Sequence, residues 1–147
     1  MHYLTLQKIY KSSNNKMTRK IIRKLDAYIF FNEKNHQKIQ IHPNDLVCDL
    51  EIDNNKDKDT LIYILHLAKD MGMFKVIYEA YCPERLLPIA EVSPSIEKYT
   101  LDEDCPYCGA CEHVILNKDF VVSFLLKEKP AYKRFFDFLF GKRICQC

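Results

Sequence analysis

The segment Cys105–Gly109, Cys-Pro-Tyr-Cys-Gly, constrains the fold more than any other part of this chain. Two cysteines separated by two residues can converge on one metal ion. The proline between them stiffens the turn, and the glycine lets a backbone amide approach the sulfurs. Such a turn is a metal knuckle, and it needs partners elsewhere in the chain because a structural zinc ion takes four ligands. We therefore expect part of the chain to fold around a tetrahedral zinc site.

The remaining ligands are expected among the cysteines and histidines near this turn. Cys82 lies 23 residues upstream and is followed by proline, but Arg85 stands where an upstream knuckle would carry its second cysteine. Arginine does not bind metal ions, so the upstream knuckle is degenerate. Cys111 and His113 are equal candidates for the fourth ligand, and Glu84 is a weaker one. The predicted ligand set is Cys82, Cys105 and Cys108 with either Cys111 or His113.

Two other kinds of site also use clustered cysteines. A redox dithiol precedes a helix in a thioredoxin-like unit, whereas residues 114–116 and 120–126 have the composition of strands. A catalytic zinc ion needs an open coordination position and a general base, and the chain has neither a His-x-Glu nor a His-Glu-x-x-His pattern. A closed structural site is favoured over both, and the chain is predicted not to be an enzyme.

The other cysteines and the N-terminus bear on the compartment. Cys48 is predicted to lie in the core because its neighbours are apolar, and Cys145 and Cys147 are predicted to form a flexible tail. No apolar run is long enough for a transmembrane helix, and residues 1–10 lack the pattern of a secretory signal. We therefore expect the reducing cytoplasm, where clustered cysteines are metal ligands more often than disulfides.

Hydrophobic spacing predicts helices in the first half of the chain. A helix is expected from Met17 to residues 32–35, because its apolar positions recur every three to four residues. An extended piece is expected at 38–41, and a short helix at 46–50 capped by Asn44 or Asp45. A further helix, capped by Asp59 or Thr60, should end at Gly72. A strand is predicted at 74–81, strands at 114–116 and 120–126, and a helix at 131–140.

This order predicts an α+β fold in three segments. Residues 1–80 are predicted to form a winged helix-turn-helix domain, because three helices with short connections precede a strand. Residues 81–116 are predicted to form an appended zinc-ribbon-like module, and residues 117–147 a strand and a C-terminal aromatic helix. Three-helix bundles without a nucleic-acid function share this pattern.

Charge is distributed unevenly, although the formal net charge is only +2. Residues 1–44 carry +7, residues 45–104 carry −8 and residues 105–147 carry +3. The predicted third helix has little basic charge, whereas phosphate neutralisation dominates affinity for DNA. A nucleic-acid contact is therefore expected, if anywhere, on the first long helix, and ordinary solvated helix faces remain the alternative. The candidate residues are Lys16, Arg19, Lys20, Arg23 and Lys24.

The C-terminal segment is unusually aromatic for a short helix. Its aromatic side chains are too many for one buried face, so some are expected to contact a partner protein. A membrane surface is the alternative that the neighbouring lysines and arginines suggest. The candidate interface residues are Phe135, Phe136, Phe138 and Phe140.

The stretch from Thr60 to Cys108 resembles small bacterial proteins that join a winged helix to a split zinc ribbon. The residues that carry the resemblance are Lys69–Gly72, Tyr78–Pro83 and Cys105–Gly109, about a third of the chain with the residues between them. Such proteins are accessory components of phage-defence operons. The chain departs from their pattern at Arg85, where they carry the second cysteine. The resemblance implies a non-enzymatic adaptor or sensor that works beside a larger effector.

Three functions follow from these observations. The first is a zinc-binding accessory subunit that docks on a larger protein effector in antiviral defence. The second is an autonomous DNA-binding transcriptional regulator that uses the basic helix. The third is a small metalloenzyme or thiol oxidoreductase.

Overall fold

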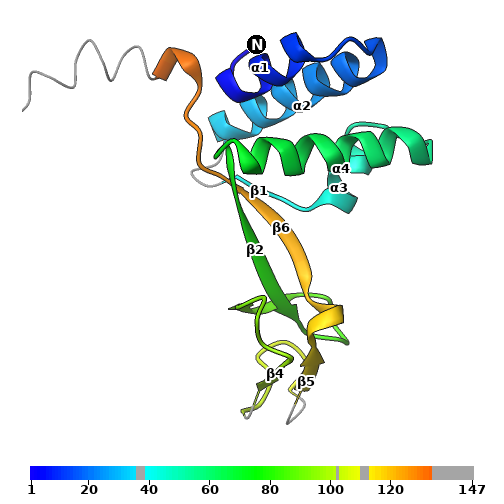
Figure 1. The fold of residues 1–147 in the computed structure, drawn as a ribbon. Coiled ribbons are helices and arrows are strands. Elements are labelled where there is room, and N and C mark those ends of the chain that lie inside the picture. The colour runs from blue at the N-terminus through cyan, green and yellow to red at the C-terminus, as the bar shows by residue number, and fades with distance from the viewer. Residues whose placement is uncertain (36–38, 102, 110–112, 134–147) are drawn as a thin grey trace, which may run out of the picture. The chain divides into compact units, whose positions relative to one another are not determined.

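A computed structural model describes residues 1–35, 39–101, 103–109 and 113–133 of the 147-residue chain. The fold is mixed α+β, as predicted (Figure 1). The elements in chain order are α1 (Leu4–Ser12), α2 (Lys16–Asn35), β1 (Gln40–Ile41), α3 (Pro43–Asp49), α4 (Asn55–Asp70), β2 (Phe74–Tyr81), β3 (Pro88–Val92), β4 (Lys98–Leu101), β5 (His113–Leu116), the 3-10 turn η1 (Asn117–Asp119) and β6 (Val121–Leu126).

The chain divides into two compact units. Unit 1 contains residues 1–75 and the described residues from Phe124 onward, and unit 2 contains Val76–Ser123. Strand β2 leaves unit 1 for unit 2, and strand β6 returns. The predicted boundaries at residues 80 and 116 both fall within unit 2, and the three-segment division stays a prediction.

Two sheets are present in the described residues. The first has the strand order β1-β6-β2-β3, with β1 antiparallel to β6 and β2 antiparallel to β3. The β2–β3 register shifts between Ala80 and Tyr81, just before the Cys82 turn. The second sheet pairs β4 with β5 in antiparallel register, from Lys98 opposite Leu116 to Leu101 opposite His113. Strands β3 and β4 are additions to the sequence prediction.

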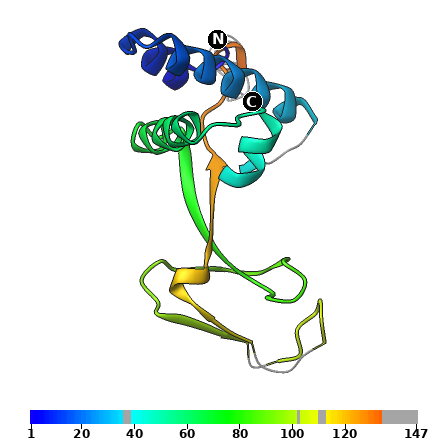
Figure 2. The same ribbon diagram turned by 90° about the vertical axis from the view of Figure 1, so that its right-hand side faces the viewer.

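The helices of unit 1 enclose its apolar core. Helix α2 packs on α1 and α4, and α3 packs on α4 (Figures 1 and 2). The predicted helical spacing is confirmed, because the apolar positions of α2 and α4 are buried together. The buried side chains include Leu6, Ile21, Ile22, Leu25, Ile29, Leu61, Ile64, Leu65 and Ala68.

Two helices begin earlier than the sequence predicts. Helix α4 begins at Asn55, where the Asn54 side chain caps it by accepting a hydrogen bond from the Asp57 N–H at 2.8 Å. The predicted caps Asp59 and Thr60 are therefore wrong, because the polar stretch taken for a turn is the first turn of the helix. Helix α3 begins at Pro43, since proline is already set for the first helical position, and neither Asn44 nor Asp45 is its cap.

The ends of α3 and α4 test two further predictions. Gly72 has a φ of +82° directly after α4, which confirms it as the residue that ends this helix. Cys48 is exposed, so its predicted core position is wrong. The reason is helical spacing, because α3 turns Leu46 inward, Leu50 beyond its end is also buried, and Cys48 lies between them on the other side.

Helix α1 was not predicted, because no residue at its start caps it. Its caps come from distant parts of the chain. The buried carboxylate of Asp26 accepts hydrogen bonds from the N–H groups of His2 and Tyr3 at 2.9 and 3.0 Å. The buried carboxylate of Glu128 accepts from Leu4 and Thr5 at 3.0 and 3.3 Å. A carboxylate at a helix N-terminus accepts hydrogen bonds from the free N–H groups. Its negative charge also interacts favourably with the positive end of the helix dipole.

Unit 2 has a much smaller apolar core. Its buried cluster consists of Ala80, Ile115 and Phe120, with partly buried apolar residues packed around it. So small a core seldom holds a unit of this size, and small units of this kind usually need disulfides or a metal ion.

Candidate metal centre

The downstream cysteine turn has the backbone of a metal knuckle. The Gly109 N–H donates to the Cys105 carbonyl oxygen at 2.8 Å, and Gly109 has a φ of +70°. The backbone N–H groups of Tyr107 and Cys108 also donate to the Cys105 thiol. The glycine therefore lies where the turn needs a residue in the left-handed conformation.

The upstream turn repeats this geometry without the second cysteine. The Leu86 N–H donates to the Cys82 carbonyl oxygen at 2.8 Å, and Leu86 has a φ of +53°. Cys82 thus corresponds to Cys105, Leu86 corresponds to Gly109, and Arg85 occupies the position of Cys108. The upstream turn keeps the backbone of a knuckle although it supplies one cysteine only.

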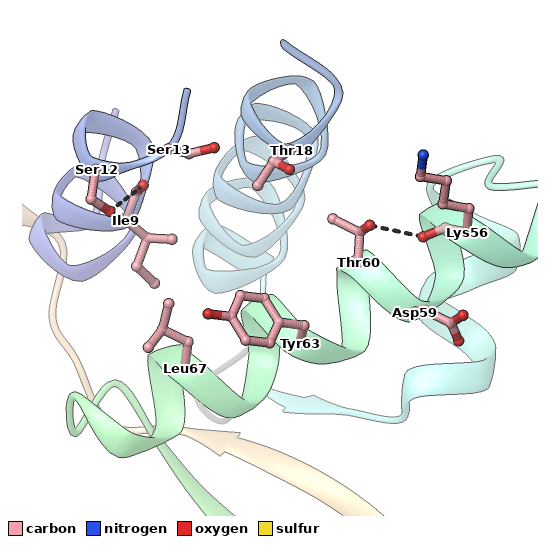
Figure 3. A pocket seen from close by; sticks show the side chains of 9 residues that line it. All are labelled: Ile9, Ser12, Ser13, Thr18, Lys56, Asp59, Thr60, Tyr63 and Leu67. Atoms are coloured by element: carbon pink, nitrogen blue, oxygen red, sulfur yellow. Dashed lines mark hydrogen bonds between the residues drawn. The ribbon is translucent and has the colours of Figure 1, made fainter. Parts of the chain in front are cut away.

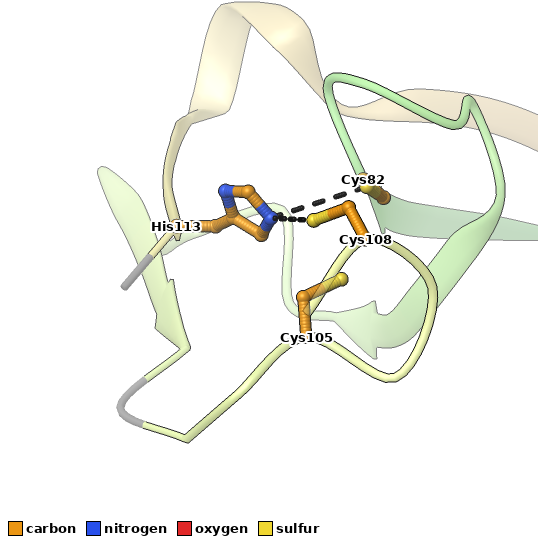
Figure 4. A group of neighbouring side chains, drawn as sticks. All are labelled: Cys82, Cys105, Cys108 and His113. Atoms are coloured by element: carbon orange, nitrogen blue, oxygen red, sulfur yellow. Dashed lines mark hydrogen bonds between the residues drawn. The ribbon is translucent and has the colours of Figure 1, made fainter. Parts of the chain in front are cut away.

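Both turns and strand β5 bring four side chains together. Cys82, Cys105, Cys108 and His113 place one ligand atom each within 4.8 Å of all the others (Figure 4). His113 begins β5, and its Nε2 lies 3.0 Å from the Cys108 sulfur and 3.9 Å from the Cys82 sulfur. All are buried except Cys108, which is half-buried.

Three thiols and an imidazole are a donor set that suits zinc. Zinc–sulfur and zinc–nitrogen bonds of about 2.3 and 2.0 Å, at tetrahedral angles, separate neighbouring ligand atoms by about 3.5–3.8 Å. The two sulfur–nitrogen separations from His113 fall on either side of this range. The four residues therefore form a candidate metal site of the Cys3His type.

The surroundings of Cys105 favour the thiolate, the form that binds metal. Burial raises the pKa of this thiol, but hydrogen bonds from the Cys108 and Tyr107 backbones and from the Cys108 and Cys82 thiols lower it. The net result is a pKa of about 6, below the ordinary value of 9.0.

Of the candidates for the fourth ligand, the structure places one in the cluster. His113 joins the cluster, whereas Cys111 lies outside the described residues, as do Cys145 and Cys147. Glu84 is exposed and does not belong to the described cluster. Cys48, Cys82, Cys105 and Cys108 are free of disulfides.

Three of the five predicted basic residues of α2 already make contacts within unit 1. Arg19 and Arg23 each lie over the Tyr10 ring at 5.1 Å, and Arg23 also donates to the Tyr10 hydroxyl at 2.5 Å. Lys24 donates to the Leu50 carbonyl oxygen at 2.5 Å. Lys16 and Lys20 are exposed. The predicted interface residues Phe135, Phe136, Phe138 and Phe140 lie outside the described residues.

A second feature, a pocket in unit 1, was not predicted from the sequence. It measures about 510 Å³ and lies between α1, the start of α2 and α4 (Figure 3). Two of its hydroxyls are already used, because Ser12 donates to the Ile9 carbonyl oxygen and Thr60 to that of Lys56. The remaining lining residues are Ser13, Thr18, Asp59, Tyr63 and Leu67. Its hydroxyls come from three elements, so no local motif could have indicated it.

Searches for related proteins give no family assignment. No family model matches the chain, and no curated protein or solved structure matches it either. Within the part of the chain that the structure describes, no helix is both long and apolar enough to cross a membrane. The candidate site therefore rests on its own geometry.

Proposed function

We propose that this protein is a non-enzymatic binding module that docks on a larger protein effector, and that a structural zinc ion holds its unit 2 together. The observation that carries the proposal is the closed set of four ligands, Cys82, Cys105, Cys108 and His113. A structural zinc ion takes four protein ligands, whereas a catalytic one takes three and keeps a position for water or substrate. The set fits the structural kind.

The remaining alternatives for the cluster are less favoured. In a thiol oxidoreductase the Cys-x-x-Cys pair opens a helix, whereas Cys105 and Cys108 lie in a turn and the next described element is strand β5. The three cysteines also approach a histidine that would serve as a fourth ligand. A reducing compartment such as the cytoplasm would keep these thiols available to zinc.

Metal analysis tests the zinc ion directly. Protein purified without chelators should contain one equivalent of zinc per chain, and a strong chelator should remove it with loss of the folded signals of unit 2. Less than about half an equivalent, or a unit 2 that stays folded after complete zinc removal, would contradict the proposal. Cobalt substitution adds a spectroscopic test, because thiolate ligands give intense charge-transfer absorption.

The order of the elements supports the winged-helix assignment. Elements α2, β1, α3, α4, β2 and β6 follow one another as in a winged helix, and β6 lies between β1 and β2 in the sheet. On this assignment the connection between the last two strands, the wing, lies within unit 2. The zinc site would then stabilise an enlarged wing.

The surface of α4 favours a protein partner over DNA. In a winged helix this is the helix that reads the major groove. Its exposed side chains include Ile62 and Tyr63, which is 63% exposed, and its exposed Lys69 pairs with Asp70 at 2.7 Å. An apolar, charge-balanced face suits protein contact better than phosphate.

A mobility-shift assay at two salt concentrations separates the adaptor from the autonomous regulator. The adaptor should show no salt-sensitive DNA binding. Retarded DNA that is released by salt, and that the double variant Lys16→Gln/Lys20→Gln no longer binds, would favour the regulator instead. These two lysines are chosen because both are exposed on α2.

We extend the proposal to antiviral defence on the resemblance of residues 60–108 alone. The larger effector would then be encoded beside this protein. Co-expression with the products of neighbouring genes, followed by purification on a tag, should recover a stable complex. A chain that purifies alone under these conditions would contradict the adaptor role.

A further inference from the structure

Three exposed apolar side chains lie on the two cysteine turns of unit 2. Leu86 is 73% exposed, Leu87 is 45% exposed and Tyr107 is 40% exposed. The Tyr107 hydroxyl donates to the Pro88 carbonyl oxygen at 3.0 Å, which joins the tip of the downstream turn to the residue after Leu87. We call Leu86, Leu87 and Tyr107 the knuckle surface.

Leu86 is unfavourable at its position in two respects. Its φ of +53° lies in the left-handed region that favours glycine, and the corresponding residue of the other turn is Gly109. Its side chain is also mostly exposed to water instead of packing in the core. Neither the backbone conformation nor burial favours leucine here, and an exposed apolar side chain held in this way is available for a contact outside the chain.

The charge of unit 2 indicates the character of the partner. Residues 76–123 contain nine acidic and three basic residues, whereas the rest of the chain is strongly basic. Glu84, Glu103 and Asp104 are exposed beside the two turns, and Arg85 is the basic exception. A partner with complementary charge would be basic.

We infer that the knuckle surface binds a segment of a partner protein that presents apolar side chains flanked by lysine or arginine. The inference rests on the proposed adaptor function and names the part of unit 2 that makes the contact. Apolar anchors would supply the affinity, and the acidic surroundings would select basic flanks.

Selection of peptides tests this inference without a known partner. The probe is a displayed library of random 16-residue peptides, applied to the immobilised zinc-loaded protein. Selected peptides should be rich in apolar residues, contain more Lys and Arg than Asp and Glu, and bind more weakly at higher salt. A failure to select any peptide above background, or selection without this charge preference, would overturn the inference.

The matched variants are Leu86→Asn and Met71→Gln. Asparagine tolerates the left-handed conformation, so Leu86→Asn should keep the turn and its zinc while weakening peptide binding by at least about tenfold. Met71, 42% exposed at the end of α4, serves as the control, and its replacement should leave binding unchanged. Equal binding of the peptides to wild type and Leu86→Asn overturns the inference.

Two readouts separate this inference from the proposed function. Suppose that Leu86→Asn keeps one zinc ion and still binds the co-purified effector as wild type does. The adaptor role then stands, but the knuckle surface is not the part of the protein that binds the effector. If sedimentation shows a wild-type dimer that Leu86→Asn abolishes, the knuckle surface binds a second copy of the chain. That result would overturn the inference that it binds a segment of a partner protein.

Discussion

Units 1 and 2 are stabilised by different means. In unit 1, apolar side chains from α1, α2 and α4 are fully buried, and distant carboxylates cap α1. In unit 2 the buried apolar cluster has three members, and four ligand atoms lie within 4.8 Å of one another. Distant side chains can substitute for local signals, as Asp26 and Glu128 do for α1, and on the proposed function unit 2 depends on its four ligands. Substitutions should therefore act through packing and caps in unit 1 and through metal binding in unit 2.

The largest effect is expected from Cys105→Ser. Because structural zinc supplies folding free energy, on the order of 10 kcal/mol in small zinc domains, losing this thiolate should unfold unit 2 and release the metal. The helices of unit 1 should keep their circular dichroism. Cys48→Ser is the matched control, since Cys48 is exposed in unit 1 and should change neither signal. A fully folded Cys105→Ser protein would refute the dependence of unit 2 on metal.

The second-largest effect is expected from His113→Ala, and adding Arg85→Cys to it compares the two cysteine turns. His113→Ala should weaken zinc binding by more than about 100-fold, because it removes a direct ligand and even outer-shell changes cost 10- to 100-fold. Adding Arg85→Cys should restore most of the affinity, since position 85 corresponds to Cys108 in a turn of the same backbone geometry. Competition with a chromophoric chelator measures both affinities. No recovery in the double variant would mean that the upstream turn cannot present a second ligand.

Glu128→Gln should act on unit 1 alone. The neutral amide can still accept hydrogen bonds from the Leu4 and Thr5 N–H groups. It lacks the negative charge that interacts favourably with the positive end of the helix dipole. We expect a loss of about 1–2 kcal/mol in the free energy of unfolding of unit 1, with zinc content unchanged. Asp53→Asn, at an exposed acid of the same unit, should be neutral. Zinc loss in the Glu128 variant would show that the two units are not independent in stability.

The smallest effect is a pair of opposite changes in unit 2. Gly109→Ala should cost about 1 kcal/mol, because nothing lies within 4 Å of the added Cβ and only the left-handed backbone resists it. Leu86→Gly should instead stabilise the zinc-loaded unit by about 0.5–1 kcal/mol. Chemical unfolding at a fixed zinc concentration measures both. Destabilisation by Leu86→Gly would remove the argument that leucine is unfavourable there.

Several features could be predicted from local sequence because their causes are local. The spacing of apolar residues predicted α2 and much of α4, and Gly72 predicted the end of α4. The Cys-Pro-Tyr-Cys-Gly motif predicted a turn, and the hydrogen bond from the Gly109 N–H to the Cys105 carbonyl oxygen shows it. The start of α4 was missed because acidic and amide residues fit a loop as well as a first helical turn.

The sequence by itself determined which side chains could bind a metal and which helices have an apolar face. Only the tertiary structure decided that His113 meets Cys82, because strand β5 and the upstream turn are far apart in the chain. It also decided that Asp26 and Glu128 cap α1, which begins without a cap of its own. The physical reason is the same in both cases. A ligand set or a distant cap is completed by groups that folding brings together, and their separation along the chain leaves no periodic pattern to identify them.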